Sequence, residues 1–251
     1  MLPANYGVGY CSLMSRFDRI GTGFLLWATI LHTVAVAQES PVWSFRDLDT
    51  ATRQLTSLTG LSGAEREQVR SIQASIGELQ EKFRTAFPGT QDAAAVQRNL
   101  PQPFRESIAA DLASIRMLNQ TGEARPSASK TRPRRAILEE LSADLALKAK
   151  FGGSGFGLGG GFPAVVKVTV ETVRQGKKED GLWVRANPRR YGVTSDPMFV
   201  FNSATSPTAT NLPPGLFVLW VETADHHVIA SQPVEIGSAN KDSELIRFSL
   251  P

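Results

Sequence analysis

The chain has 251 residues, a formal net charge of +3 and a single cysteine, Cys11. Because Cys11 lies in the first segment of the chain, the rest cannot form disulfides, thiolate zinc sites or a nucleophilic thiol. The overall charge is too small to indicate a nucleic-acid-binding protein. The chain length predicts one or two modest domains, and two is the better fit.

Residues 1–37 are typical of an export signal peptide. Arg16 and Arg19 precede an apolar run over residues 20–36. The small residues Ala37 and Ala35 occupy the first and third positions before the predicted cut, as a signal peptidase requires. We therefore expect an exported protein that works in the periplasm or outside the cell.

Two features of this leader stay open. Met14 begins a leader of ordinary length, so either Met1 or Met14 is the initiator. The apolar run is also nearly long enough to span a bilayer, so the alternative to cleavage is a retained membrane anchor.

Residues 38–118 are predicted to form a helical bundle. A first helix is expected over residues 45–58, and a second begins at the capping box formed by Ser62 and Glu65. A third helix is expected after two prolines at 101 and 103. Apolar residues recur every three or four positions in the last two helices: Val69, Ile72, Ile76, Leu79 and Phe83, then Phe104, Ile108, Leu112, Ile115 and Leu118. These stripes predict a closed core rather than an exposed surface for a partner helix.

Residues 119–135 are predicted to be a basic, flexible linker because their apolar periodicity stops. Its cations indicate either an ordinary solubilising segment or a tether that binds an anionic polymer of the envelope. The candidate polyanion-binding residues are Lys130, Arg132, Arg134 and Arg135.

A short helix is expected over residues 136–151, with Ile137, Leu141 and Leu145 on its apolar face. Residues 152–161 are mostly glycine and are predicted to be the domain hinge. Their spacing matches a dinucleotide-binding loop, but that motif needs a strand before it and a helix after it, which is the reverse of the order here.

Residues 162–251 are predicted to form an antiparallel β-sandwich, so the fold class is α+β. The first strand alternates Val166, Val168 and Val170 with polar residues. Further strands are expected over residues 181–186, 197–201, 216–223, 227–236 and 244–250. Trp183 and Trp220 are predicted to lie in the sandwich core.

Residues 165–250 resemble a carboxypeptidase regulatory-like or transthyretin-like domain. The likeness lies in the valine-alternating strand, in Gly181-Leu-Trp-Val184, and in Leu212-Pro-Pro-Gly215 leading into the strand over residues 216–221. The resemblance implies an immunoglobulin-like sandwich that serves as a binding or spacer module and has no catalytic residues of its own.

Few residues form a pattern that indicates chemistry. Asp225-His226-His227 is expected at a solvated hairpin tip, and it is too short a ligand set for a metal site. Catalytic carboxylate pairs need opposed groups across a cleft. We therefore expect solvated surface positions for the other acidic clusters, which are Glu139, Glu140 and Asp144 on the last helix and Glu179-Asp180 in a hairpin loop.

These patterns favour an exported, non-catalytic binding or scaffolding protein of the bacterial cell envelope. The alternatives are a periplasmic hydrolase with a site between its two domains, and a membrane-anchored sensor or assembly subunit. We predict no catalytic, cofactor-binding or metal-binding residues. The expected partner is a protein or an envelope polymer rather than nucleic acid, and a membrane only if the leader is retained.

Overall fold

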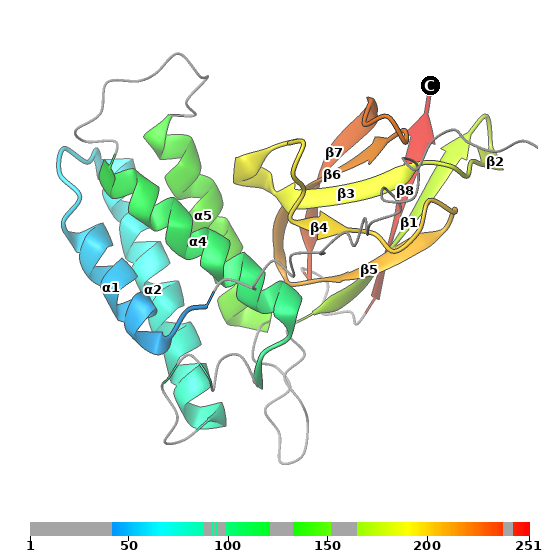
Figure 1. The fold of residues 1–251 in the computed structure, drawn as a ribbon. Coiled ribbons are helices and arrows are strands. Elements are labelled where there is room, and N and C mark those ends of the chain that lie inside the picture. The colour runs from blue at the N-terminus through cyan, green and yellow to red at the C-terminus, as the bar shows by residue number, and fades with distance from the viewer. Residues whose placement is uncertain are drawn as a thin grey trace, which may run out of the picture. The chain divides into compact units, whose positions relative to one another are not determined.

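The computed structural model describes residues 42–87, 92, 94, 99–120, 133–151, 165–237 and 243–251. Helices are followed along the chain by the strands of a sandwich, which confirms the predicted α+β class (Figure 1). The predicted signal peptide and the predicted hinge over residues 152–161 lie outside the described residues.

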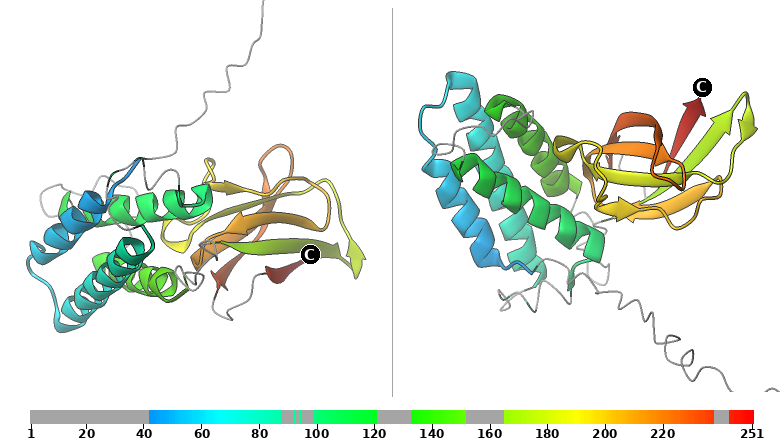
Figure 2. Two further views of the ribbon diagram at one scale, coloured as in Figure 1. Left: turned by 90° about the horizontal axis from the view of Figure 1, so that it is seen from below. Right: turned by 45° about the horizontal axis from the view of Figure 1, so that its top comes forward.

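The described helices pack as a bundle around one hydrophobic core (Figure 2). They are α1 (Phe45–Thr56), α2 (Gly63–Ala86), α4 (Gln102–Gln120) and α5 (Arg134–Phe151). Helix α1 packs on α2 and α4, and α5 packs on the same two helices. Every residue of the two predicted apolar stripes is buried in this core, so the prediction of a closed bundle is confirmed.

Helix α5 belongs to this bundle, whereas the sequence suggested a separate short helix after a linker. Leu138, Leu141 and Leu145 are buried in the same core as the other helices, and Ile137 is partly buried beside it. The predicted linker is also shorter than expected, because α4 continues to Gln120 and α5 starts at Arg134.

The early start of α5 has a local cause and a tertiary one. The carbonyl of Pro133 accepts the first hydrogen bonds of the helix, from the amide of Ala136 at 2.9 Å among others. The side chain of Arg134 contacts the start of α2 and the loop before it. Its Nε donates to Glu65 Oε1 at 3.0 Å, and its Nη2 donates to the carbonyl of Gly60 at 2.9 Å.

Glu65 also closes the predicted capping box at the start of α2. The Ser62 amide donates to Glu65 Oε2 at 2.8 Å, and the Glu65 amide donates to Ser62 Oγ at 3.3 Å. The Glu65 carboxylate therefore caps the N-terminal end of α2 and also anchors the first turn of α5.

The first sheet of the sandwich is built on β1 (Val166–Arg174). Strands β2 (Lys177–Lys178) and β5 (Thr208–Leu212) pair with it antiparallel, and β8 (Ser243–Leu250) pairs with it parallel. The parallel pairing departs from the expected antiparallel order. A period of two places side chains on a face, but it does not set the direction of the neighbouring strand.

The second sheet has the order β4-β3-β6-β7 and is antiparallel throughout. Its strands are β4 (Phe199–Val200), β3 (Trp183–Pro188), β6 (Gly215–Glu222) and β7 (Val228–Ile236). Strands β2 and β5 were not predicted because they are short and polar. A 3₁₀ turn, η1 (Arg189–Tyr191), follows β3 where no helix was expected, and it places two arginines beside the bundle.

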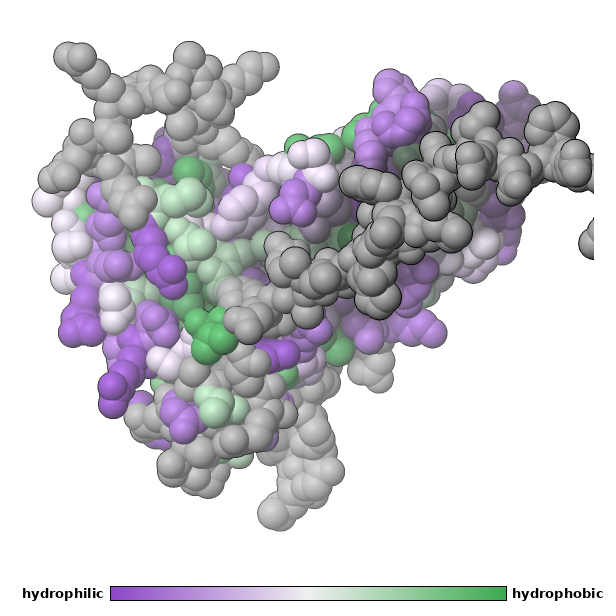
Figure 3. Space-filling view, in the orientation of Figure 1, coloured by the Kyte–Doolittle hydropathy of each residue, from purple (hydrophilic) through white to green (hydrophobic). Residues whose placement is uncertain are grey.

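On the face shown in Figure 3, hydrophilic residues lie along the outer edge of the helices, and a band of hydrophobic residues runs beside them. No helix in the described part of the chain is both long enough and apolar enough to cross a membrane.

The Glu65–Arg134 pair predicts an acid-sensitive contribution to stability. The hydrogen bond from Arg134 is the main cause that lowers the pKa of Glu65 from 4.5 to about 2. The ionised group therefore stabilises the fold above its unfolded pKa of 4.5, and this contribution is lost as the pH falls through about 2. We expect Glu65→Gln to lower the free energy of unfolding at neutral pH by on the order of 1 kcal/mol.

Urea unfolding at several pH values measures this effect. The stability gap between wild type and Glu65→Gln should close as the pH approaches 2, the folded-state pKa. Glu67→Gln is the matched control, because the Glu67 carboxylate is 74% exposed and pairs with Arg70 at the surface. A gap that stays constant with pH contradicts the assignment.

Candidate functional site

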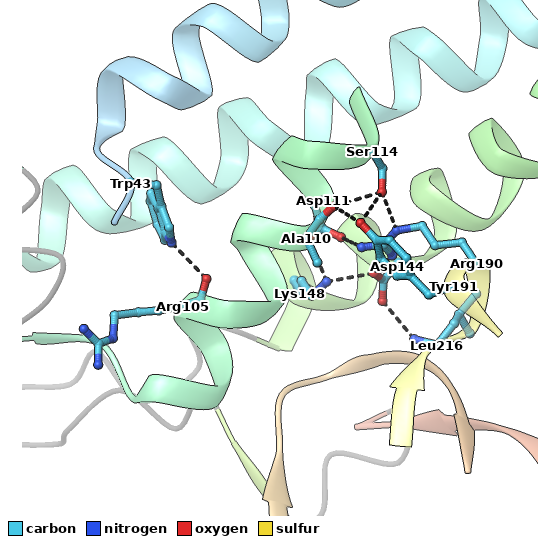
Figure 4. A network of polar contacts seen from close by, with 10 residues as sticks. All are labelled: Trp43, Arg105, Ala110, Asp111, Ser114, Asp144, Lys148, Arg190, Tyr191 and Leu216. Carbon is cyan, nitrogen blue, oxygen red and sulfur yellow. Dashed lines mark hydrogen bonds and ion pairs between the residues drawn. The ribbon is translucent and has the colours of Figure 1, made fainter. Parts of the chain in front are cut away.

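Helices α4 and α5 each bury a polar face in addition to their apolar stripe. On α4 this face carries Asp111 and Ser114, and on α5 it carries Asp144 and Lys148, all of them buried. Both helices approach the sandwich on this side, where α5 contacts η1 and β6. The polar faces meet Arg190 of η1 and form what we call the ionic cluster: Asp111, Asp144, Lys148 and Arg190 (Figure 4).

Every charged atom in the ionic cluster has a partner. Lys148 Nζ donates to Asp111 Oδ2 at 2.7 Å and to Asp144 Oδ2 at 2.8 Å. Arg190 Nη2 donates to Asp111 Oδ1 at 2.5 Å, and its Nη1 donates to Asp144 Oδ2 at 2.6 Å. The third guanidinium nitrogen, Nε, donates to Ser114 Oγ at 2.8 Å. Two anions and two cations therefore balance one another through hydrogen bonds as well as charge.

The backbone of the sandwich completes the network. The Leu216 amide donates to Asp144 Oδ1 at 2.9 Å, and the Tyr191 hydroxyl donates to the carbonyl of Ala110 at 2.9 Å. Asp144 can approach β6 this closely because Gly215 has no side chain: a Cβ there would lie 2.3 Å from Asp144 Oδ1. The glycine of the Leu-Pro-Pro-Gly turn is thus required by a helix far away in sequence.

The pKa values of the two carboxylates are shifted in opposite directions. Burial raises the pKa of Asp111 to about 6 against the attraction of Lys148 and Arg190. Burial opposes ionisation of Asp144 too, but the same cations and the Leu216 amide outweigh it and lower the pKa of Asp144 to about 2. Because the two carboxylates share the same cations, they titrate as one coupled pair.

The ionic cluster is suited to holding the bundle against the sandwich and not to reacting with a substrate. The four charged side chains are at most 3% exposed. Buried ions stabilise an interface only when their hydrogen bonds are complete, and removing one partner leaves an uncompensated charge. Such a network specifies one docking geometry between the helices and the sheet.

The structure corrects the expected exposure of Asp144, which lies inside the ionic cluster instead of at the solvated surface. Of its predicted companions, Glu139 is exposed, and Glu140 is half-buried and pairs with Arg189 of η1 at 3.4 Å. Glu179 pairs with Arg174 across the expected hairpin, at 2.5 Å.

Asp111 and Lys148 were missed because charged residues on a helix are usually solvated, and Arg190 was missed because it lies in η1, which was not predicted. A signal was present on both helices. Asp111 lies next to the apolar position Leu112 on α4, and Asp144 and Lys148 are one helical turn apart beside Leu145. Opposite charges at that spacing, next to an apolar stripe, can mark a second buried face.

The other predicted residues are not brought together. His226 and His227 are exposed in the turn after β6, as expected for a hairpin tip. No group of three or more histidine, cysteine or acidic residues converges to hold a metal ion within the described ranges. Trp220 is fully buried, as predicted, although it lies outside the hydrophobic cluster of the sandwich. Trp183 is only half-buried, so its placement in the core was wrong.

The predicted polyanion tether is divided. Arg134 and Arg135 belong to the first turn of α5, where Arg134 is held by Glu65 and Arg135 is exposed. Lys130 and Arg132 lie outside the described residues.

No family of known proteins and no curated protein matches this sequence.

Charge balance in the ionic cluster predicts a strongly non-additive mutant series. Lys148→Met leaves two buried carboxylates with one cation, so it should lower the free energy of unfolding by about 3–5 kcal/mol. Adding Asp111→Asn restores neutrality and keeps an oxygen for Arg190, so the double variant should be more stable than the Lys148 variant by about 1–3 kcal/mol.

Denaturant unfolding of the full chain measures this series. Arg70→Met, which removes an exposed cation that is paired at the surface, is the control and should change stability by less than about 0.5 kcal/mol. Additive effects of the two cluster substitutions contradict charge balance as the organising feature.

Gly215 provides an independent test of the approach between α5 and β6. Gly215→Ala places a methyl group against Asp144 Oδ1 and should lower the free energy of unfolding by about 3 kcal/mol. Gly77→Ala is the matched control, because Gly77 is exposed within α2 with no atom near its Cβ position, and alanine there should stabilise the helix by up to about 1 kcal/mol. Equal effects of the two substitutions contradict the close approach.

Proposed function

We propose that this chain is an exported, non-catalytic binding or scaffolding protein of the bacterial cell envelope. The observation that carries this proposal is the ionic cluster, which joins helices and sandwich through charges that are already neutralised by one another. A junction of this kind supports a fixed platform that presents surfaces, because none of its acids or bases can reach a substrate.

The proposed export rests on the sequence of the first segment. The leader over residues 1–37 has the charge, apolar run and small residues of a signal peptide. The likeness of residues 165–250 to carboxypeptidase regulatory-like domains supports a binding or spacer role for the sandwich. We propose a protein or an envelope polymer as the partner, and Lys130, Arg132 and Arg135 remain candidate polyanion contacts.

For the rival proposal, a hydrolase with a site between helices and sandwich, the buried carboxylates that the described residues place at this junction are Asp111 and Asp144. Those carboxylates accept hydrogen bonds from Lys148 and Arg190 and are 2% exposed. A hydrolytic activity that is lost in the Asp111→Asn variant while the variant stays folded would favour the rival.

Fractionation of cells that produce the full chain tests the proposal directly. We expect the mature protein in the periplasm or the medium with Gln38 as its first residue, because a signal peptidase cuts after the small residue Ala37. N-terminal sequencing of that fraction is the measurement. Replacing Ala35 and Ala37 with glutamine should block processing and leave the precursor in the membrane. Cytosolic protein that still begins at Met1 or Met14 would overturn the export proposal.

A further inference from the structure

The second sheet carries a polar and aromatic cluster on the face opposite its core. Trp183 and Arg185 of β3 lie across from Glu222 and Trp220 of β6, respectively. The alternate residues of both strands are buried in the sandwich core, so these four side chains belong to the outer face.

Glu222 organises this outer-face cluster. Its carboxylate accepts from Trp220 Nε1 at 2.9 Å, from Arg185 Nε at 3.0 Å and from His226 Nδ1 at 3.0 Å. Burial opposes its ionisation, but these three hydrogen bonds outweigh burial and lower the pKa of Glu222. Because Glu222 is ionised and already takes three donors, it fixes the positions of its neighbours.

Arg185 is held in place by Glu222 and Trp183, but only one of its three guanidinium nitrogens donates to a described acceptor. Its side chain is 13% exposed, and its guanidinium carbon lies 5.1 Å from the centre of the Trp183 ring. Stacking on the indole leaves the guanidinium N–H groups directed within its own plane. Only Nε has an acceptor among the described residues, so the fork of Nη1 and Nη2 is left for an external acceptor.

His226 lies beside this arginine in the tight turn between β6 and β7, where its amide donates to the carbonyl of Thr223 at 3.0 Å. Its φ of 62° is in the left-handed region, which histidine adopts more readily than most residues, and the turn fixes its position next to Glu222. Its Nδ1 contacts the same oxygen of Glu222 as Arg185 does, while its side chain is 71% exposed. The second imidazole nitrogen, Nε2, has no partner among the described residues.

We propose that Arg185, Trp183 and His226 form a binding site for the carboxylated sugar of an acidic polysaccharide. The carboxylate would accept from Nη1 and Nη2 of Arg185 as a bidentate pair. The half-exposed Trp183 offers an apolar surface to the sugar ring, and His226 Nε2 offers a polar contact to a hydroxyl. This proposal rests on the proposed envelope function and names the class of polymer.

Local charge favours a singly charged group over a denser anion. Glu222 already balances Arg185, and Asp225 lies in the same turn as His226. A hydrogen bond from Thr223, together with the nearby His227 and His226, lowers the pKa of Asp225 and keeps it ionised. A sugar carboxylate with neutral hydroxyls therefore fits this site better than a phosphate or a sulfate.

Calorimetric titration of the full chain with oligogalacturonate tests the proposal. The methyl-esterified form of the same oligosaccharide is the matched probe, since it keeps the sugar and removes the charge. We expect the ester to bind at least about tenfold more weakly, and Arg185→Gln to weaken oligogalacturonate binding by about the same factor. Arg247→Gln is the control variant, because Arg247 is a 63% exposed arginine of the other sheet.

A second variant guards against a folding defect, because Arg185→Gln removes a partner of the buried Glu222. His226→Asn changes an exposed side chain to one that suits the left-handed backbone at φ 62° and keeps an amide donor for Glu222, so it should weaken binding by about threefold with an unchanged unfolding midpoint, as for a single neutral hydrogen bond. Equal binding of acid and ester, or equal binding by wild type and Arg185→Gln, overturns the proposal.

Two further outcomes also overturn it. Binding that is lost when Lys130, Arg132 and Arg135 are replaced by glutamine, yet kept in Arg185→Gln, assigns the polymer to the basic segment. Tighter, Arg185-dependent binding of a polyglutamate peptide replaces the sugar with an acidic peptide. Failure of the titration with normal export removes only this site, whereas cytosolic retention removes the envelope function itself.

Discussion

Four buried charges that sum to zero set the arrangement of this protein's helices and sandwich. Asp111 and Asp144 come from two helices. Both carboxylates pair with Lys148 of α5 and with Arg190 of η1 in the sandwich. Because each ion would be costly to bury alone, all four must be present at once, and they are present only when the bundle and the sheet are docked. The absence of a side chain at Gly215 then allows the close contact between α5 and β6.

Directional bonds explain why polar residues occur at this junction. An apolar contact would tolerate sliding, whereas the hydrogen bonds from Arg190 and the Leu216 amide have one satisfied geometry. The Glu65–Arg134 pair follows the same logic at the other end of α5, where one carboxylate caps α2 and anchors the next helix. Helix α5 is thus fixed near both ends by charge and along its length by the apolar core.

The two arginine-centred clusters differ in a way that separates structure from function. All three guanidinium nitrogens of Arg190 donate to protein acceptors, and the residue is sealed from solvent. Arg185 is oriented by Glu222 and Trp183 but keeps its outer nitrogens without a described acceptor. The first arrangement completes the fold, and the second is the one that can recognise a ligand.

Local patterns in the sequence determined the helices and the longer strands, the capping box at Ser62 and the apolar stripes of α2 and α4, because helix and strand periodicity depend on neighbouring residues alone. Only the tertiary structure decided that Asp144 is buried, that β8 runs parallel to β1 and that Trp183 lies outside the core. These features depend on partners distant in the chain. A charge can be buried only where its counter-charges converge, and the spacing of residues along one segment carries no record of that meeting.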